Sequence, residues 1–354
     1  MTFPIPVHSS TRVDRAGRNL ANCVSSSNDE VALDLEVVSN WRASHAYALN
    51  TFQATLRNKL ARLGIANALV GQRLKRMPSI ERKLQRNTGM RLTQMQDIAG
   101  LRAVVGNASD VARLVQDYDT SRFDHIRTEA DDYLQEPKSD GYRSVHLMYR
   151  YQNHSRPEYN RCRVELQVRT RLQHAWATAV ETIDAFTGQD IKAGNAGAQW
   201  GRLFVVASAL LADREDLPRP GDLRSVEHDH LVEELRHLEH TLQLRSRLGG
   251  YASSLRQIGT MPSSNRTHAY YLIILNTQEM WFNIFPFAST EQDAASNAYS
   301  TWEARGNGEL DVVLIAGGSV AQLRHAYPNY FADATEFVRF LNETLRPREG
   351  VLAR

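Results

Sequence analysis

The segment RVELQVRT, residues 163–170, alternates between polar and apolar side chains. Its valines and leucine fall on one face of an extended chain, and Glu165, Gln167 and Arg169 fall on the other. The pattern therefore predicts a strand with one buried face and one polar face. A carboxylate fixed among arginines on a rigid sheet suits a general base or a magnesium ligand. An ordinary strand with one hydrated face is the alternative interpretation.

The chain around this strand mixes the periods of helices and strands. Strands are predicted over 98–105 and 144–151, with a helix over 109–118 between them. Apolar residues recur at helical spacing from Leu33 to Leu63 and end at Gly64, and residues 172–212 are again helical with a break near 188–201. These elements predict an α+β core.

Four segments are predicted along the 354 residues. Residues 1–28 have no apolar periodicity and are predicted to be a mobile leader, and residues 29–212 form the main unit. A charged linker over 213–224 precedes a C-terminal module, 225–354, that is a small α/β domain. Its predicted elements are a helix at 226–258, strands at 268–276, 280–287 and 310–316, and helices at 290–304, 319–327 and 333–345.

Composition excludes several classes of protein. The 42 Lys and Arg nearly balance the 40 Asp and Glu, which argues against wholesale wrapping of nucleic acid. The two cysteines, Cys23 and Cys162, have no metal-binding spacing, and we expect them to be reduced thiols in a cytoplasmic protein. No secretion signal or membrane-spanning stretch is evident, and neither a P-loop nor a GxGxxG motif is present.

A basic segment forms a candidate anion site. Residues 71–103 contain eight Lys and Arg against Glu81 and Asp97, a net charge of +6. On a helix beginning near Ser79, the side chains of Ser79, Lys83 and Arg86 share one face, which suits a polyphosphate. A solvated basic helix is the alternative.

The segment EPKSDGYRSVHLMYRY, residues 136–151, places a turn before a strand. Tyr142 is suited to stack on a base, and Lys138, Arg143 and His146 are suited to bind phosphate. The alternative is turn chemistry followed by a surface strand.

Asp97 stands where the apolar strand 98–105 begins, which suits either a magnesium ligand or a strand-edge cap. Strict alternation puts Asp97 and Arg102 on opposite faces. A bulge at Gly100 is predicted to bring both to one site.

Four blocks of sequence, in this order, resemble the synthetase domain of the RelA/SpoT alarmone enzymes over about residues 30–190. They are RLKRMPSIERKLQR, DIAGLR, EPKSDGYRSVH, and VELQVRT followed by QHAWATAVE. The resemblance implies a mixed, mostly antiparallel sheet flanked by helices, as in nucleotidyltransferase-like synthetase domains.

The resemblance also implies a role for each matching residue. Arg73 and Arg102 would sandwich the adenine of ATP, and Lys75, Ser79 and Lys83 would bind its phosphates. Asp97 and Glu165 would hold magnesium, with Glu165 and Gln167 at the reacting acceptor hydroxyl. Tyr142 would stack on the guanine of the acceptor, surrounded by Lys138, Arg143, His146 and Arg169.

The implied activity is the transfer of pyrophosphate from ATP to the 3′-hydroxyl of GDP or GTP, which makes (p)ppGpp. No hydrolase motif precedes the synthetase blocks, so we expect synthesis without hydrolysis. Some toxic relatives, including phage-defence toxins, modify the 3′ CCA end of tRNA or adenine nucleotides instead, and the arginines of the loop 150–163 keep an RNA acceptor open. Residues 225–354 are expected to bind a protein or ligand effector, or to form a homo-oligomer.

Overall fold

A mixed five-stranded sheet forms the centre of the computed structural model. The structure describes residues 3–22, 27–120, 122, 124–187, 198–245, 248, 270–276, 281–288, 290–305, 310–316 and 334–346. The strands are β1 (Leu69–Leu74), β2 (Ala99–Val105), β3 (Ile126–Asp132), β4 (Val145–Arg150) and β5 (Arg163–Thr170). Their order across the sheet is β1-β2-β5-β4-β3.

The pairing of these strands confirms the predicted mostly antiparallel arrangement. β5 runs parallel to β2 and antiparallel to β4, while β1 with β2 and β3 with β4 are antiparallel pairs. β5 has the predicted bounds, and β2 and β4 begin within one residue of prediction. β1 and β3 were not predicted.

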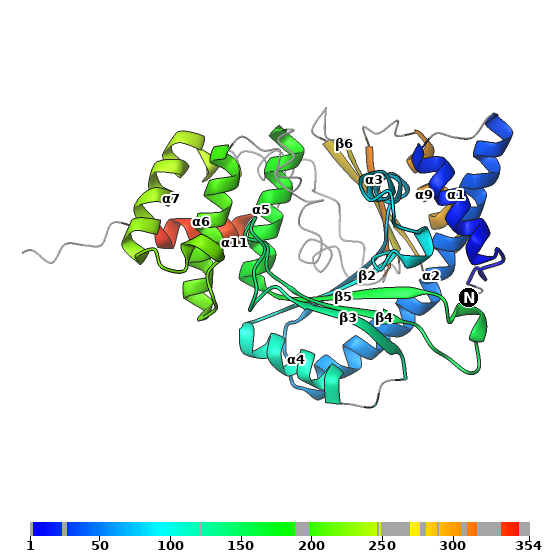
Figure 1. The fold of residues 1–354 in the computed structure, drawn as a ribbon, viewed down its shortest axis with the longest axis horizontal. Coiled ribbons are helices and arrows are strands. Elements are labelled where there is room, and N and C mark those ends of the chain that lie inside the picture. The colour runs from blue at the N-terminus through cyan, green and yellow to red at the C-terminus, as the bar shows by residue number, and fades with distance from the viewer. Residues whose placement is uncertain are drawn as a thin grey trace, which may run out of the picture.

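Two helices cover the apolar face of the sheet (Figure 1). They are α2 (Asn28–Arg62), which is a single long helix, and α4 (Ala108–Thr120). The Ser27 side chain accepts a hydrogen bond from the Glu30 N–H and caps the start of α2. Phe52 and Leu56 of α2 lie in one buried core with Leu166 of β5. The polar side chains of β5 therefore project from the opposite face.

The predicted mobile leader is wrong for residues 10–22. They form helix α1 (Ser10–Asn22), whose Val13 and Ala16 are buried in a core shared with Trp41 of α2. Arg12 Nη1 also pairs with Asp34 Oδ1 at 2.5 Å. Small apolar residues among many polar ones gave too weak a pattern to predict the helix, whose stability comes from packing on α2.

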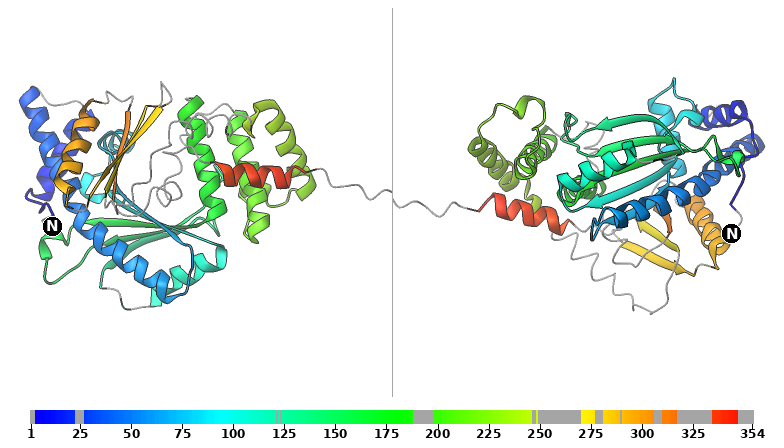
Figure 2. Two further views of the ribbon diagram at one scale, coloured as in Figure 1. Left: turned by 180° about the vertical axis from the view of Figure 1, so that it is seen from behind. Right: turned by 90° about the horizontal axis from the view of Figure 1, so that it is seen from below.

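Four helices form a second core beside the sheet. They are α5 (Arg171–Thr187), α6 (Ala198–Glu215), α7 (His228–Leu242) and α11 (Thr335–Thr344). Figure 2 places this group at one end of the molecule and α1 and α9 at the other. The division of the chain at residues 213–224 stays a prediction. Helices from both sides of it share this core, and the rings of Phe204 and Phe337 stack at 6.0 Å.

A small antiparallel sheet follows in the C-terminal part, in the order β7-β6-β8. Its strands are β6 (Tyr270–Asn276), β7 (Trp281–Phe287) and β8 (Leu310–Ala316), with α9 (Gln292–Arg305) packed on them. β8 lies beside β1, the edge strand of the large sheet. The helix predicted at 319–327 lies outside the described residues. Among the helices that are described, none has the length and apolar character needed to cross a bilayer.

Candidate active site

The polar face of β5 is the floor of the candidate site. Glu165 pairs with Gly100 of β2, and Gln167 pairs with Arg102. On the other side, Gln167 pairs with His146 of β4. Directly paired residues of neighbouring strands project from the same face. The sheet register therefore brings all four side chains to one surface, as the alternation of RVELQVRT predicted.

Glu165 is held by two neighbours. His146 Nδ1 lies 3.0 Å from its Oε1, and Gln167 Nε2 donates to its Oε2 at 2.9 Å. Burial by itself raises the pKa of Glu165, but the hydrogen bond and charge of His146 outweigh it and leave the pKa lowered. Glu165 is therefore ionised at neutral pH and can accept a proton or ligate a cation.

A chain of hydrogen bonds links Glu165 to Tyr142. The Tyr142 hydroxyl lies 2.9 Å from His146 Nε2. His146 thus contacts Glu165 through Nδ1 and Tyr142 through Nε2. The position of the aromatic ring is thereby tied to the carboxylate.

Asp97 joins the basic segment to the sheet. Its carboxylate oxygens lie 2.6 Å from Lys75 Nζ and 2.9 Å from Lys83 Nζ. Burial raises the pKa of Asp97, but the two ammonium groups more than reverse this and hold the pKa at about 2. Burial in turn lowers the pKa of Lys75, and the charge of Asp97 opposes that change. The carboxylate therefore stays charged throughout the physiological range.

The predicted bulge at Gly100 is wrong. The pairs of β2 with β1 and with β5 run without a register shift from Ala99 onward. Asp97 lies in the turn before β2, where strand alternation does not constrain its direction. Asp97, Arg102 and Glu165 line one small cavity of about 50 Å³ together with Arg73 and Gln167. This volume suits an ion and its waters.

The residues predicted to bind ATP come from β1, β2 and α3 and the turn between β1 and α3. Arg73 of β1 pairs with Gly100, two residues before Arg102 on the same face, so the two arginines lie diagonally across β1 and β2. Helix α3 (Met77–Arg86) carries Ser79 in its first turn and Lys83 one turn later. Pro78 near the start of α3 favours the helical φ and lacks the N–H that the first turn leaves unpaired.

On the acceptor side, Lys138 and Tyr142 lie together with a tyrosine that the sequence did not predict. Lys138 Nζ lies 4.4 Å from the centre of the Tyr133 ring and 5.4 Å from that of Tyr142. The Tyr133 ring also meets the His146 ring edge-on at 5.2 Å. Tyr133 follows the exposed strand β3, and only its closeness to the DGY turn in the sequence hinted at a role.

The structure does not bring Arg143 to the site, which corrects its predicted role in acceptor binding. Arg143 is 2% exposed and donates to Ser208 Oγ at 3.0 Å and to the Pro218 carbonyl oxygen at 2.7 Å. It follows Tyr142 along the chain, so it points to the opposite side and fastens the turn to α6. Burial lowers its pKa to about 10.

Arg169 lies under the acceptor side. It is 2% exposed and hydrogen-bonds to His174 of α5. Burial and the neighbouring Arg102 charge lower the pKa of Arg169 to about 9, and its charge in turn acts on Tyr142. Contact between Arg169 and an acceptor stays a prediction.

Gly141 sets the direction of the turn that carries Tyr142. Its φ is +88°, and a Cβ at this position would lie 2.9 Å from the Cβ of Ser208. The Ser208 hydroxyl donates to the Gly141 carbonyl oxygen at 2.6 Å. A glycine is required because both the backbone conformation and the approach to α6 exclude a side chain.

Part of the sequence matches a known protein family. Residues 72–184 match the family described as a region found in RelA / SpoT proteins. The strands of the mixed sheet, β1 to β5, lie almost wholly within this matched segment.

Among curated proteins, the chain is similar to two GTP pyrophosphokinases of Bacillus subtilis (strain 168). It is 34% identical to YjbM over 90 residues, which cover 25% of this chain and 42% of that protein. It is 31% identical to YwaC over 113 residues, which cover 30% of this chain and 52% of that protein. The chain thus spans about half the length, or less, of these relatives.

Among solved structures, the chain is similar to two proteins from Bacillus subtilis. Small alarmone synthetase 2 has a TM-score of 0.43 and 24% identity, over 50% of this chain and 94% of that one. Small alarmone synthetase 1, bound to its product pppGpp, has a TM-score of 0.41 and 25% identity, over 49% of this chain and 89% of that one.

Proposed function

We propose that this chain is a pyrophosphotransferase that moves the β,γ-pyrophosphate of ATP onto the 3′-hydroxyl of GDP or GTP, making (p)ppGpp. The observation that carries the proposal is the cavity lined by Asp97 and Glu165: Lys75 and Lys83 contact Asp97, and His146 links Glu165 to Tyr142. Support comes from the match of residues 72–184 to the RelA/SpoT family and from relatives named GTP pyrophosphokinase.

The balanced reaction assigns a task to each half of the site. The acceptor 3′-oxygen forms a bond to the β-phosphorus of ATP, the bond from that phosphorus to the α-phosphate oxygen breaks, and AMP leaves. Glu165 takes the proton of the hydroxyl, and Gln167 fixes the orientation of the Glu165 carboxylate. Lys75 and Lys83 offset charge on the triphosphate, which is the main requirement in phosphoryl transfer.

Asp97 and Glu165 fit magnesium by their chemistry. Both are ionised oxygen donors facing one small cavity, and magnesium is usually bound by one or two carboxylates together with substrate phosphates. When bound, the ion supplies charge neutralisation on the phosphate oxygens. Arg73 and Arg102 would stack on the adenine, and Tyr142 on the acceptor base.

The decisive experiment follows the label of γ-³²P-ATP into a panel of acceptors. GDP, GTP, AMP, ADP, ATP and bulk tRNA are each incubated with the full chain and magnesium, and products are separated by chromatography. We expect label in 3′-pyrophosphorylated guanosine nucleotides with release of AMP. Label in another acceptor, with none in GDP or GTP, would refute the guanine-nucleotide assignment. No label in any acceptor would refute the transferase.

The variant Glu165→Gln tests the chemical assignment. It keeps the size of the side chain and removes the base, so transfer should fall by roughly 100-fold or more. Glu36→Gln, an exposed substitution on α2, is the matched control and should leave the rate unchanged. Unchanged transfer in Glu165→Gln would show that another group takes the proton.

An RNA acceptor is the second candidate, and a basic cavity favours it. This cavity of about 430 Å³ is lined by Arg150, Arg161 and Arg163, and its described lining contains no acidic residue. Arg163 lies two residues from Glu165 on β5, within reach of a chain whose 3′ end occupies the site. The tRNA reaction in the panel tests this candidate. If tRNA is labelled, Arg150→Gln should weaken the labelling of tRNA and leave that of GDP unchanged.

A further inference from the structure

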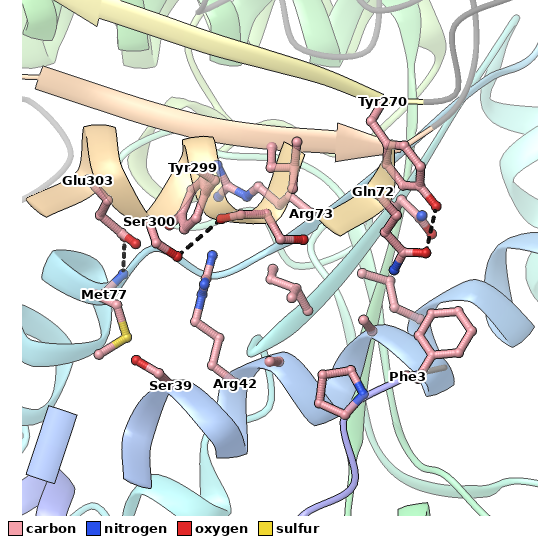
Figure 3. A pocket seen from close by; sticks show the side chains of 18 of the residues that line it. Phe3, Ser39, Arg42, Gln72, Arg73, Met77, Tyr270, Tyr299, Ser300 and Glu303 are labelled. Carbon is pink, nitrogen blue, oxygen red and sulfur yellow. Dashed lines mark hydrogen bonds between the residues drawn. The ribbon is translucent and has the colours of Figure 1, made fainter. Parts of the chain in front are cut away.

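A larger cavity lies beside the site described above, with which it shares Arg73, and is bordered by the C-terminal elements. It measures about 520 Å³ and is lined by α2, by β1 and the start of α3, and by α9 with β6 and β8 (Figure 3). The segment around Phe3 closes one side. Pockets of roughly 300 to 1,000 Å³ are typical of small-molecule sites.

Specific contacts across the rim hold the cavity in shape. The Arg42 guanidinium of α2 lies 4.6 Å from the centre of the Tyr299 ring of α9. Arg42 Nε also donates to the Lys75 carbonyl oxygen at 2.6 Å, and the Met77 N–H of α3 donates to Glu303 Oε1 at 3.0 Å. Figure 3 shows these side chains from α2, α3 and α9 gathered around one space. The cavity is therefore enclosed by elements that are fastened to each other.

The charges in the lining balance. The charged residues among its described members are Arg42 and Arg73 against Glu81 and Glu303, and most of the remaining surface is apolar. Burial and the neighbouring Glu303 raise the pKa of Glu81. An anion as highly charged as a nucleotide would meet two carboxylates here. The lining instead favours a molecule without net charge.

Two buried polar atoms of the lining, Gln72 Oε1 and the Tyr299 hydroxyl oxygen, have no hydrogen-bond partner among the described residues. Gln72 of β1 is 5% exposed, and its Oε1 accepts no hydrogen bond among the described residues. Buried side-chain oxygens are rarely left unpaired, because desolvating them costs free energy. A ligand with an N–H or O–H group would satisfy this acceptor.

We propose that this cavity binds a neutral, mainly apolar small molecule that donates one hydrogen bond to Gln72. The cavity shares Arg73 with the proposed ATP side, but none of the described residues on the acceptor side lines it, so the proposal does not depend on which acceptor is used. A ligand here would be the effector expected for residues 225–354, bound where α9, β6 and β8 meet α2, β1 and α3.

The probe for the test is N-phenyl-1-naphthylamine, an uncharged aromatic amine with a single N–H that fluoresces strongly in apolar surroundings. Titration into the full chain without nucleotide should show saturable binding with one site per chain. Gln72→Met keeps the volume of the side chain and removes the acceptor, and it should weaken binding roughly three- to ten-fold.

Two variants that fill the cavity from opposite walls test its location. Ala46→Phe on α2 and Ser296→Phe on α9 should each weaken probe binding at least ten-fold, with circular dichroism and thermal melting confirming the fold. Ala294→Phe, at an exposed position of α9 outside the lining, is the matched control and should bind the probe like the wild type. The second filling variant serves if the first does not fold.

Two results would overturn the proposal. One is the absence of saturable binding to the wild-type chain. The other is binding that persists in a folded cavity-filling variant, which would place the probe elsewhere on the surface. Because the titration measures binding directly, its outcome does not depend on whether the chain transfers pyrophosphate.

Discussion

Replacing Asp97 by asparagine should destabilise the protein by an amount that depends on pH. The carboxylate contacts the ammonium groups of Lys75 and Lys83 at 2.6 and 2.9 Å, and its pKa falls from the ordinary 3.8 to about 2. At about 1.4 kcal/mol per pH unit, this difference corresponds to about 2 kcal/mol of stability at neutral pH. Asparagine keeps the shape of the side chain and removes this contribution.

The sign of the pH dependence follows from the lowered pKa. The native state holds the Asp97 proton less tightly than the unfolded state, so the contribution is fully present above pH 3.8 and is lost as the pH falls through about 2. The difference between wild type and Asp97→Asn should therefore be about 2 kcal/mol at pH 7 and roughly half of that at pH 3.

Urea unfolding followed by circular dichroism at both pH values measures this difference. Glu36→Gln, which also replaces an exposed carboxylate by an amide, should change the free energy of unfolding by less than about 0.5 kcal/mol at either pH. Equal destabilisation of Asp97→Asn at pH 7 and pH 3, or none at pH 7, would refute the assignment of the two ion pairs.

Substitutions at Arg143, Tyr142 and Gly141 distinguish residues that bind the acceptor from residues that stabilise the fold. Arg143→Met should lower the free energy of unfolding by about 3 kcal/mol, because three hydrogen bonds are lost. It should leave the KM for the acceptor unchanged, and a raised KM in a stable variant would show that Arg143 binds the acceptor. Tyr142→Ala should raise the KM for the acceptor at least ten-fold, whereas Tyr142→Phe, which keeps the ring, should raise it less than three-fold. Equal effects of the two variants would exclude stacking of the Tyr142 ring on the acceptor base. Gly141→Ala should lower the stability by about 2 kcal/mol in thermal melts, whereas Gly221→Ala, with open space around it, should not.

The parts of the fold that the sequence predicted are those whose pattern reflects burial directly. β5 alternates because one face packs on α2 and α4, and α2 keeps its apolar stripe over 35 residues. β1 and β3 lacked such a signal. β1 is a six-residue edge strand that contains Gly71, and β3 is exposed along nearly its whole length, so its pairing with β4 rests on the backbone.

The sequence predicted which residues belong to the candidate site better than it predicted the direction in which their side chains point. Glu165 and Gln167 lie where alternation placed them, because a paired strand leaves only two directions. Asp97 and Arg143 lie in or beside turns, where local backbone geometry decides the direction of each side chain. Arg143 accordingly points into α6 although Tyr142, its neighbour, faces the site.

No pattern in the sequence predicted the contact between α3 and α9. Glu303 accepts the Met77 N–H across 226 positions of the chain, and Arg42 joins Tyr299 to the carbonyl of Lys75. Lys75 in turn pairs with Asp97, so two residues, Arg42 and Lys75, connect Tyr299 of α9 to the Asp97 carboxylate. A ligand in the cavity would touch both Arg42 and Arg73. Among the described residues, α9 is thus joined to α2 and α3, next to the segment that carries Lys75 and Asp97.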